Sequence, residues 1–159
     1  MRCRLTDGFT LVELLVVIAL LLLLGGLAMP RVGGSLVEYR LISEARFAHA
    51  HAQAVRQYAI MRSRDTRIEY LNTAPARIWV RDHQSGAILP EFAERILPEG
   101  FALWPVGQTS KMVIYNSRGE ASWIPSVSPP NRIIIRAPNG QERHLLFHRA
   151  GRIMLQKPQ

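Results

Sequence analysis

Side chains that could bind a metal are few in this sequence and poorly spaced for that role. His49 and His51 lie two positions apart in a segment with helical periodicity, so their side chains fall on nearly opposite faces of a helix. His144 and His148 share one face of an expected strand, but they lie too far apart along it to chelate one ion without further ligands. The sequence therefore predicts no metal site and no bound cofactor.

The one cluster of residue types found in hydrolases is Asp82, His83 and Ser85, in the stretch "RDHQSG". These residues are neighbours in an expected turn, whereas a catalytic triad is assembled from side chains that the fold brings together. No Gly-x-Ser-x-Gly elbow, phosphate loop or dinucleotide fingerprint is present in the sequence. We interpret the cluster as a hairpin connection and expect no catalytic residues, no enzymatic activity and no small-molecule substrate.

A single carboxylate, Glu13, interrupts the apolar run "GFTLVELLVVIALLLLLGGLAMP". Phe9 to Met29 is long enough to cross a bilayer, at about 1.5 Å per residue over roughly 30 Å of hydrocarbon. Arg2 and Arg4 precede it and orient the start of the chain toward the cytoplasm. A carboxylate inside such a segment costs on the order of 2.5–3.5 kcal/mol. A plain signal anchor, or a secretory signal cleaved near Gly26–Ala28, needs no such charge.

The hexapeptide "GFTLVE" resembles the processing motif of type IV prepilins and type II secretion pseudopilins. The resemblance implies that prepilin peptidase cuts after Gly8 and that the new terminus, Phe9, is N-methylated. It also implies that Glu13 pairs with the terminal amine of a neighbouring subunit in the filament core, and a buried charge is tolerable only when paired. Pro30 lies where many members place a helix-kinking proline. Cleavage would remove Cys3, the only cysteine.

A second helical segment is expected after a flexible break at "RVGGS", which contains Gly33 and Gly34 and follows Pro30. It carries one apolar stripe whose members alternate in spacing by four and three, and it ends near Ser63. The members of the stripe are Leu41, Ala45, Ala48, Ala52, Val55 and Ala59. Its many alanines predict close packing against another element.

From Thr66 onward the pattern changes to short strands separated by turns. "TRIEYL" and "ARIWVR" are expected to pair through Asn72–Pro75, and "GFALW" and "KMVIY" follow. The tail predicts three strands with turns at Pro138–Gly140 and Ala150–Gly151. The predicted fold class is α+β and pilin-like: a long N-terminal helix, transmembrane in its first half, packed against an antiparallel β-sheet domain. The expected regions are a leader (1–8), a transmembrane and filament-core helix (9–29), a kink with an amphipathic periplasmic helix (30–63), and a periplasmic β-rich domain (64–159).

The chain carries a net charge of +8, which suits an acidic partner such as nucleic acid, lipid headgroups or an acidic protein. Strand alternation points Arg77, Trp79 and Arg81 outward together, as phosphate contact with base stacking would require. In the tail, alternation assigns Ile133, Ile135, Leu145, Phe147, Ile153 and Leu155 to the core face. The opposite face then carries Arg132, Ile134, Arg136, His144, Leu146, His148, Arg152 and Met154. Two alternatives remain for these faces: Trp79 packs under a loop with its arginines stacked on it, or the tail face contacts a neighbouring subunit.

The order of elements resembles H-type secretion pseudopilins and FimT-like minor pilins, whose final hairpin closes on a glycine–arginine pair, here Gly151–Arg152. FimT-like members that bind DNA tend to carry a second arginine two residues later, where this chain has Met154. The resemblance implies a minor subunit, at or near the tip of a periplasmic filament, of a Gram-negative type II secretion system. A FimT-like subunit of a type IV pilus that binds DNA for uptake is the alternative, and a plain membrane-anchored periplasmic domain is the third. The implied partners are other subunits, prepilin peptidase and the inner membrane, which the chain crosses once with its C-terminal domain in the periplasm.

Overall fold

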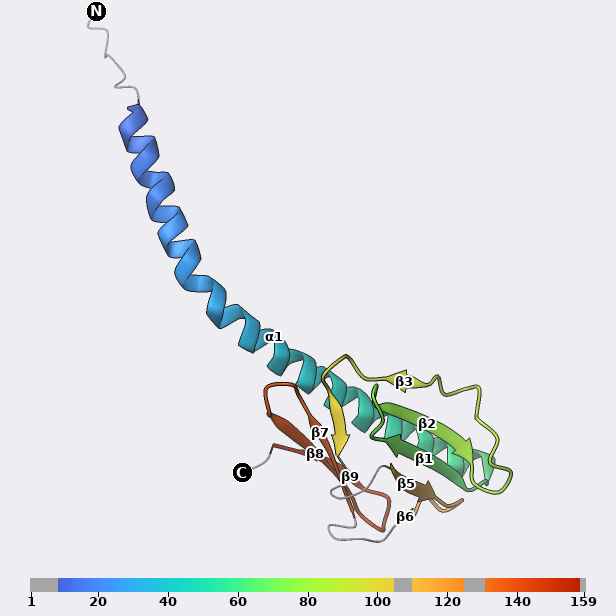
Figure 1. Ribbon diagram of the computed structural model, residues 1–159. Helices are drawn as coiled ribbons and strands as arrows, with labels where there is room; N and C mark the ends of the chain where they lie inside the picture. Colours follow the sequence, from blue (N-terminus) through green and yellow to red (C-terminus); the bar gives the residue numbers. More distant parts are fainter. Residues whose placement is uncertain (1–8, 105–109, 125–130, 158–159) are drawn as a thin grey trace, which may run out of the picture. The chain divides into compact units, whose positions relative to one another are not determined.

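The computed structural model describes residues 9–104, 110–124 and 131–157, so the expected leader and Gly8 lie outside the described residues. The chain divides into two compact units, Met1–Leu36 and Val37–Gln159. The helix α1 (Leu11–Arg62) begins in the first unit and ends in the second (Figure 1). Within the described part of the chain, no helix combines the length and the apolar character needed to cross a membrane.

Helix α1 continues without interruption through Pro30, Gly33 and Gly34. The sequence predicts a break in the helix at this point, and that prediction is wrong for the backbone. Proline lacks one amide donor and glycine weakens a helix by only about 1 kcal/mol, so the turns on either side can hold the segment helical. A kink at Pro30 stays a prediction.

The part of α1 in the second unit supplies one side of the core. All six members of the expected apolar stripe are at most 1% exposed, from Leu41 at one end to Ala59 at the other. They form a single cluster with the inward side chains of the strands, among them Tyr70, Leu103 and Phe147. Because four of the six are alanines, the strands can lie close to the helix axis.

Within the described residues, nine strands form two antiparallel sheets that lie along this part of α1 (Figure 1). The five-stranded sheet has the order β3-β2-β1-β5-β6, and its strands are β1 (Thr66–Leu71), β2 (Arg77–Asp82), β3 (Arg95–Ile96), β5 (Ser110–Tyr115) and β6 (Ala121–Ile124). The four-stranded sheet has the order β4-β7-β8-β9, and its strands are β4 (Ala102–Trp104), β7 (Arg132–Arg136), β8 (Glu142–Phe147) and β9 (Ile153–Gln156). The pairing of β1 with β2 and the three tail strands confirm the predicted elements. The strands β3 and β6 were not predicted.

Two turns from different sheets meet at one helix residue, Arg56. The guanidinium Nε of Arg56 donates a hydrogen bond to the carbonyl of Gly119, in the β5–β6 turn, over 2.9 Å. Gly151, in the β8–β9 turn, has a φ of 79°, and a Cβ there would overlap the Gly119 carbonyl oxygen and the Arg56 side chain. The amide of Ala121 also donates to the carbonyl of Arg149, which joins the two sheets at the same place. The close approach explains why the expected glycine–arginine pair begins with glycine.

Candidate functional site

The first described residues form a helix start that is capped by Thr10. The Thr10 hydroxyl accepts a hydrogen bond from the amide of Glu13 over 3.3 Å, which makes Thr10 the N-cap of α1. Phe9, just ahead of the cap, is 79% exposed. Glu13 lies in the first turn of α1, where its negative charge is favoured by the unpaired amides of the helix start. Phe9 therefore lies just ahead of the first helical turn, which carries Glu13.

In the described part of the first unit, the side chains that follow are not covered by other residues. From Leu11 to Leu24 the residues of α1 are exposed, with Leu11 at 76% and Leu22 at 72%. A continuous apolar surface of this kind on a helix requires lipid or other helices to cover it.

The arginine-flanked tryptophan on β2 lies where alternation predicts, but its polar atoms are occupied. The indole Nε1 of Trp79 donates to the carboxylate of Glu94 over 2.6 Å, and Arg77 donates to the same oxygen over 2.9 Å. The guanidinium of Arg81 stacks over the Trp79 ring at 4.8 Å, an arrangement that the sequence left open as an alternative to base stacking.

A second carboxylate, Glu69 on β1, forms ion pairs with one arginine of its own strand and one of β2. Arg67 lies 2.9 Å from one of its oxygens and Arg81 lies 3.2 Å from the other. Arg81 also donates to the carbonyl of Gly86 over 3.0 Å. Arg77 and Arg81 are thus both engaged with acceptors of the chain itself.

The tail face contains a third carboxylate-centred cluster, around Glu142. Arg136 approaches one Glu142 oxygen at 2.6 Å, and His144 lies 3.2 Å from the other. Burial is the largest influence on the pKa of Glu142 and raises it, but the hydrogen bonds from His144 and Arg136 together hold the pKa below its ordinary value. The pair of Arg136 and Glu142 faces directly across the β7–β8 ladder.

The rest of the tail face is more enclosed than the sequence predicts. The six inward positions are confirmed, with Leu155 partly buried and the other five buried. Ile134, expected on the outward face, is only 6% exposed, so this expectation is wrong. Arg132, His148 and Met154 are half-buried, whereas Arg152 is exposed. Of the cations expected on this face, Arg152 is exposed, whereas Arg136, although partly exposed, is held by Glu142.

The histidines and the "RDHQSG" cluster occupy separate environments. His49 Nε2 lies 3.3 Å from the carbonyl of Ile153, whereas the His51 ring stacks on Phe47 at 5.5 Å. The Ser85 hydroxyl donates directly to the Asp82 carboxylate over 2.8 Å within a tight turn, so His83 does not bridge the two side chains. Among the residues that the structure describes, no group of three metal-binding side chains comes together.

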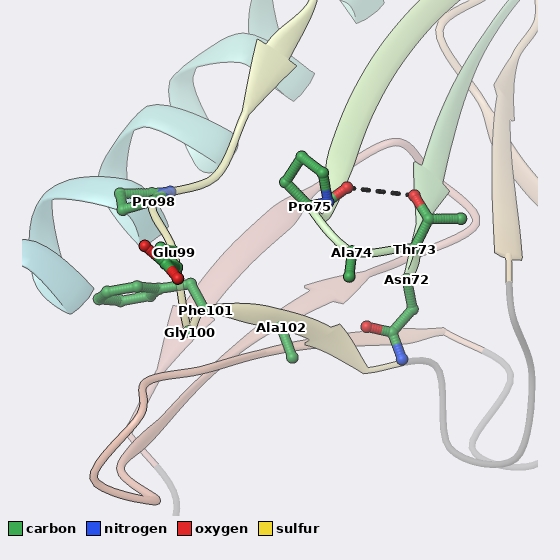
Figure 2. Close-up of a pocket in the computed structure, with 9 residues that line it drawn as sticks. All are labelled: Asn72, Thr73, Ala74, Pro75, Pro98, Glu99, Gly100, Phe101 and Ala102. Atoms are coloured by element: carbon green, nitrogen blue, oxygen red, sulfur yellow. Dashed lines mark hydrogen bonds between the residues drawn. The ribbon is translucent and has the colours of Figure 1, made fainter.

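A hollow of about 520 Å³ lies between the β1–β2 turn and the segment that leads into β4. Figure 2 shows its lining, with Asn72 to Pro75 on one side and Pro98 to Ala102 on the other. The Thr73 hydroxyl is used locally, by a hydrogen bond to the Pro75 carbonyl over 3.1 Å. Apart from Asn72 and Glu99 the wall offers little polar chemistry, which fits a contact surface better than a reaction site.

The three carboxylates that occupy the arginines were missed by reasoning from the sequence. The pairing of Glu142 could have been predicted, because the expected turn at Pro138–Gly140 fixes a hairpin register that places Glu142 opposite Arg136. Glu69 is the cross-strand neighbour of Trp79 in the same way. Glu94 had no such signal, because it reaches β2 from an irregular segment.

Comparisons with known proteins agree with this arrangement. Residues 4–29 match the prokaryotic N-terminal methylation motif. The fold is similar to that of the type IV minor pilin FimU of Pseudomonas aeruginosa (19% identity, TM-score 0.55, covering 77% of this chain and 95% of that one). It is also similar to that of the minor pseudopilin EpsH from the type 2 secretion system of Vibrio cholerae (15% identity, TM-score 0.54, covering 75% and 98%). No curated protein sequence matches the chain.

The structural relatives are less than 25% identical to this chain, so they report on its fold. The α+β class predicted from the sequence is confirmed by both of them. The chain thus combines a prepilin-type N-terminal methylation motif with the pilin-like fold of minor pilins and minor pseudopilins.

Proposed function

We propose that this chain is a non-enzymatic minor pseudopilin, which joins the tip of the periplasmic filament of a type II secretion system. The observation that carries the proposal is the methylation motif at residues 4–29 at the head of a pilin-like fold. The precursor would be held in the inner membrane by Phe9–Met29 as a single span, with the following residues in the periplasm.

Assembly would follow removal of the leader. Prepilin peptidase cuts between Gly8 and Phe9 and methylates the new terminal amine, and Glu13 pairs with the amine of a neighbouring subunit. Two features of the first unit support this order of events. Thr10 caps α1, which leaves Phe9 outside the helix and reachable by an enzyme, and the exposed apolar side chains from Leu11 onward provide surface to bury against neighbours.

The mass of the mature chain tests the processing step. After co-expression with a prepilin peptidase, we expect an intact mass that corresponds to a chain starting at methylated Phe9. The variant Gly8→Val should keep the leader, since the peptidase has to accommodate the residue before the cut. A wild-type chain that starts at Met29, or that remains intact from Met1, would overturn the proposal.

A DNA-binding minor pilin of a type IV pilus is the second candidate, and one observation favours it. Arg152 is exposed beside the close-packed Gly151, and Arg149 on the same turn is also exposed. The engagement of Arg77, Arg81 and Arg136 by carboxylates supports the secretion assignment instead, since these arginines would have to leave their partners to contact phosphate.

Binding of a short DNA duplex across a salt series separates the two candidates. Under the secretion assignment we expect no binding at low salt. A DNA-binding subunit would show an affinity that falls steeply with salt, because each phosphate contact releases counterions. It would also lose binding when Arg132, Arg136 and Arg152 are changed to glutamate. Since Arg136→Glu also places two carboxylates together, Arg152→Glu alone is the cleaner variant.

A further inference from the structure

A polar groove lies beside the contact between α1 and the β8–β9 turn in the Val37–Gln159 unit. It has a volume of about 410 Å³, and its lining includes Gln53, Arg56, Gln57, Gly151, Arg152 and Ile153. Two arginines and two carboxamides provide hydrogen-bond donors, and none of the lining residues that the structure describes is acidic. The groove therefore has the charge and the donors for an anionic ligand.

One of the two arginines of the groove, Arg56, is held in place by a hydrogen bond to the β5–β6 turn. Arg56 is half-buried, and its Nε is fixed by the hydrogen bond to the Gly119 carbonyl over 2.9 Å. The absence of a side chain at Gly151 leaves room for the guanidinium, since a Cβ there would overlap it. Among the described residues, no acceptor engages the two terminal nitrogens of Arg56. A guanidinium fixed through Nε is preorganised to bind a carboxylate with those two nitrogens.

The remaining polar groups suit a polypeptide. Gln53 and Gln57 are exposed and one helical turn apart, so their carboxamides lie on the same face of α1. A carboxamide both donates and accepts, which matches the peptide group, whereas a phosphodiester only accepts. The groove also borders β9, the edge strand of its sheet, where the Ile153 carbonyl already lies 3.3 Å from His49 Nε2 of α1.

The cationic character ends at the turn, which disfavours a nucleic acid in this groove. The hollow on the other side of the turn is lined by Arg149 together with the carboxylate of Glu120. A phosphodiester chain has one charge for each nucleotide and needs a longer row of cations than the pair provided here.

We propose that this groove receives an acidic segment of a neighbouring filament subunit, with a carboxylate between Arg56 and Arg152 and the peptide backbone against Gln53 and Gln57. The inference rests on the proposed function, because it assigns the contact to a partner within the filament. It adds the chemistry of that contact and the residues that make it.

The test uses the full chain in detergent with isotope-labelled glutamine, so that the side-chain amides of Gln53 and Gln57 report directly by NMR. The probes are a synthetic peptide of alternating Glu and Ala, its counterpart with Gln in place of Glu, and a single-stranded thymidine oligonucleotide. The variants are Arg152→Glu and Gln57→Glu, and Arg40→Glu serves as the matched control. Arg40 is exposed on the same helix, about 20 Å from Gln53 by helical rise.

We expect the acidic peptide to shift both amide signals and the Gln counterpart to leave them in place. Affinity should fall about tenfold in Arg152→Glu and in Gln57→Glu, and by less than about twofold in Arg40→Glu. No shift with the acidic peptide, or an equal loss in Arg40→Glu, would overturn the proposal. Tighter binding of the oligonucleotide through the same residues would also overturn it, in favour of a nucleic-acid site.

Failure of the groove and failure of the proposed function are distinguishable. A chain that is processed to methylated Phe9 but does not bind the acidic peptide keeps the pseudopilin assignment and loses the groove. A chain that is not processed loses the assignment whatever the groove binds.

Discussion

Gly151 shows how a single residue can hold two turns and a helix together. Its φ of 79° is accessible mainly to glycine, and a Cβ at this position would overlap the Gly119 carbonyl oxygen and Arg56. Gly140, in the β7–β8 turn, has a similar φ of 82°, but nothing lies within 4 Å of the position where its Cβ would be. The two glycines therefore separate the cost of backbone conformation from the cost of packing.

We expect Gly151→Ala to destabilise the Val37–Gln159 unit by about 2–4 kcal/mol, because the new methyl group has to displace the Gly119 turn or Arg56. Gly140→Ala should cost only about 1 kcal/mol, from its left-handed backbone alone. Guanidinium unfolding of both variants measures the difference. Equal losses would mean that the approach of the two turns is not close packed.

Lys111 is a buried cation at the junction of the two sheets, 4% exposed. Its ammonium donates to the Arg132 carbonyl over 3.2 Å. Burial, assisted by the charge of Arg132, lowers the pKa of Lys111 to about 8. The unfolded chain therefore binds this proton more tightly than the folded one, so Lys111 reduces stability most at neutral pH, and stability should rise as the pH passes from about 8 to about 10.

We expect Lys111→Met to remove this dependence. The difference in unfolding free energy between wild type and variant should change in favour of wild type by up to about 3 kcal/mol between about pH 7 and about pH 10. Other groups titrate alike in both chains and cancel in the comparison. A constant difference over this range would contradict the assignment of the shift to Lys111.

Among the elements, aromatic contacts and one ion pair hold the segment from Leu89 to Leu97 against α1. This segment includes β3. Arg95 donates to both carboxylate oxygens of Glu44, at 2.6 and 3.2 Å, and its guanidinium lies 4.7 Å from the centre of the Phe47 ring. The His51 ring lies between Phe47 and Phe92, and among the described residues neither of its nitrogens has a hydrogen-bond partner. Burial lowers the pKa of His51.

Protonation of His51 should weaken the packing of this segment on α1 and lower the free energy of unfolding. The nearby charged and titratable groups are Arg95 and Glu44, already paired with each other, and Tyr58, which donates to Glu91 over 3.2 Å. With no acceptor available, the imidazolium is favoured in the unfolded chain, so stability should fall as the pH drops below about 6.5. Comparison of wild type with His51→Leu by chemical unfolding at about pH 7.5 and about pH 5.5 measures the effect. The same loss in both chains would assign the acid sensitivity to other groups.

For the whole molecule, the proposed filament assembly depends on Glu13, which lies in the first unit. We expect Glu13→Val to be processed at Phe9 but to enter filaments poorly, because the terminal amine of a neighbour would be buried without a counter-charge. Immunoblotting of sheared filaments together with the intact mass of the membrane-bound pool separates the two steps. Full incorporation of the variant would contradict the pairing, and loss of processing would assign Glu13 to recognition by the peptidase.

Much of the architecture could be predicted because it depends on local patterns. The alanine stripe of α1, the pairing of β1 with β2 and the three tail strands each follow from a periodicity read over a few residues. Glu13 in its apolar run and the hexapeptide around it likewise predicted the N-terminal methylation motif, which residues 4–29 match. These features are set by the residues themselves and need no distant partner.

The tertiary structure decided which strands become neighbours and which arginines remain free. A strand with one buried face has the same alternation whichever sheet it joins, so the sequence could not place β4 beside β7 or β5 beside β1. Likewise, the sequence predicted both Arg77 and Arg152 as outward-facing cations. The fold brings Glu94 to Arg77 and leaves Arg152 exposed. Hydrophobic periodicity is a short-range property, whereas the pairing of charges depends on residues that meet only after the chain has folded.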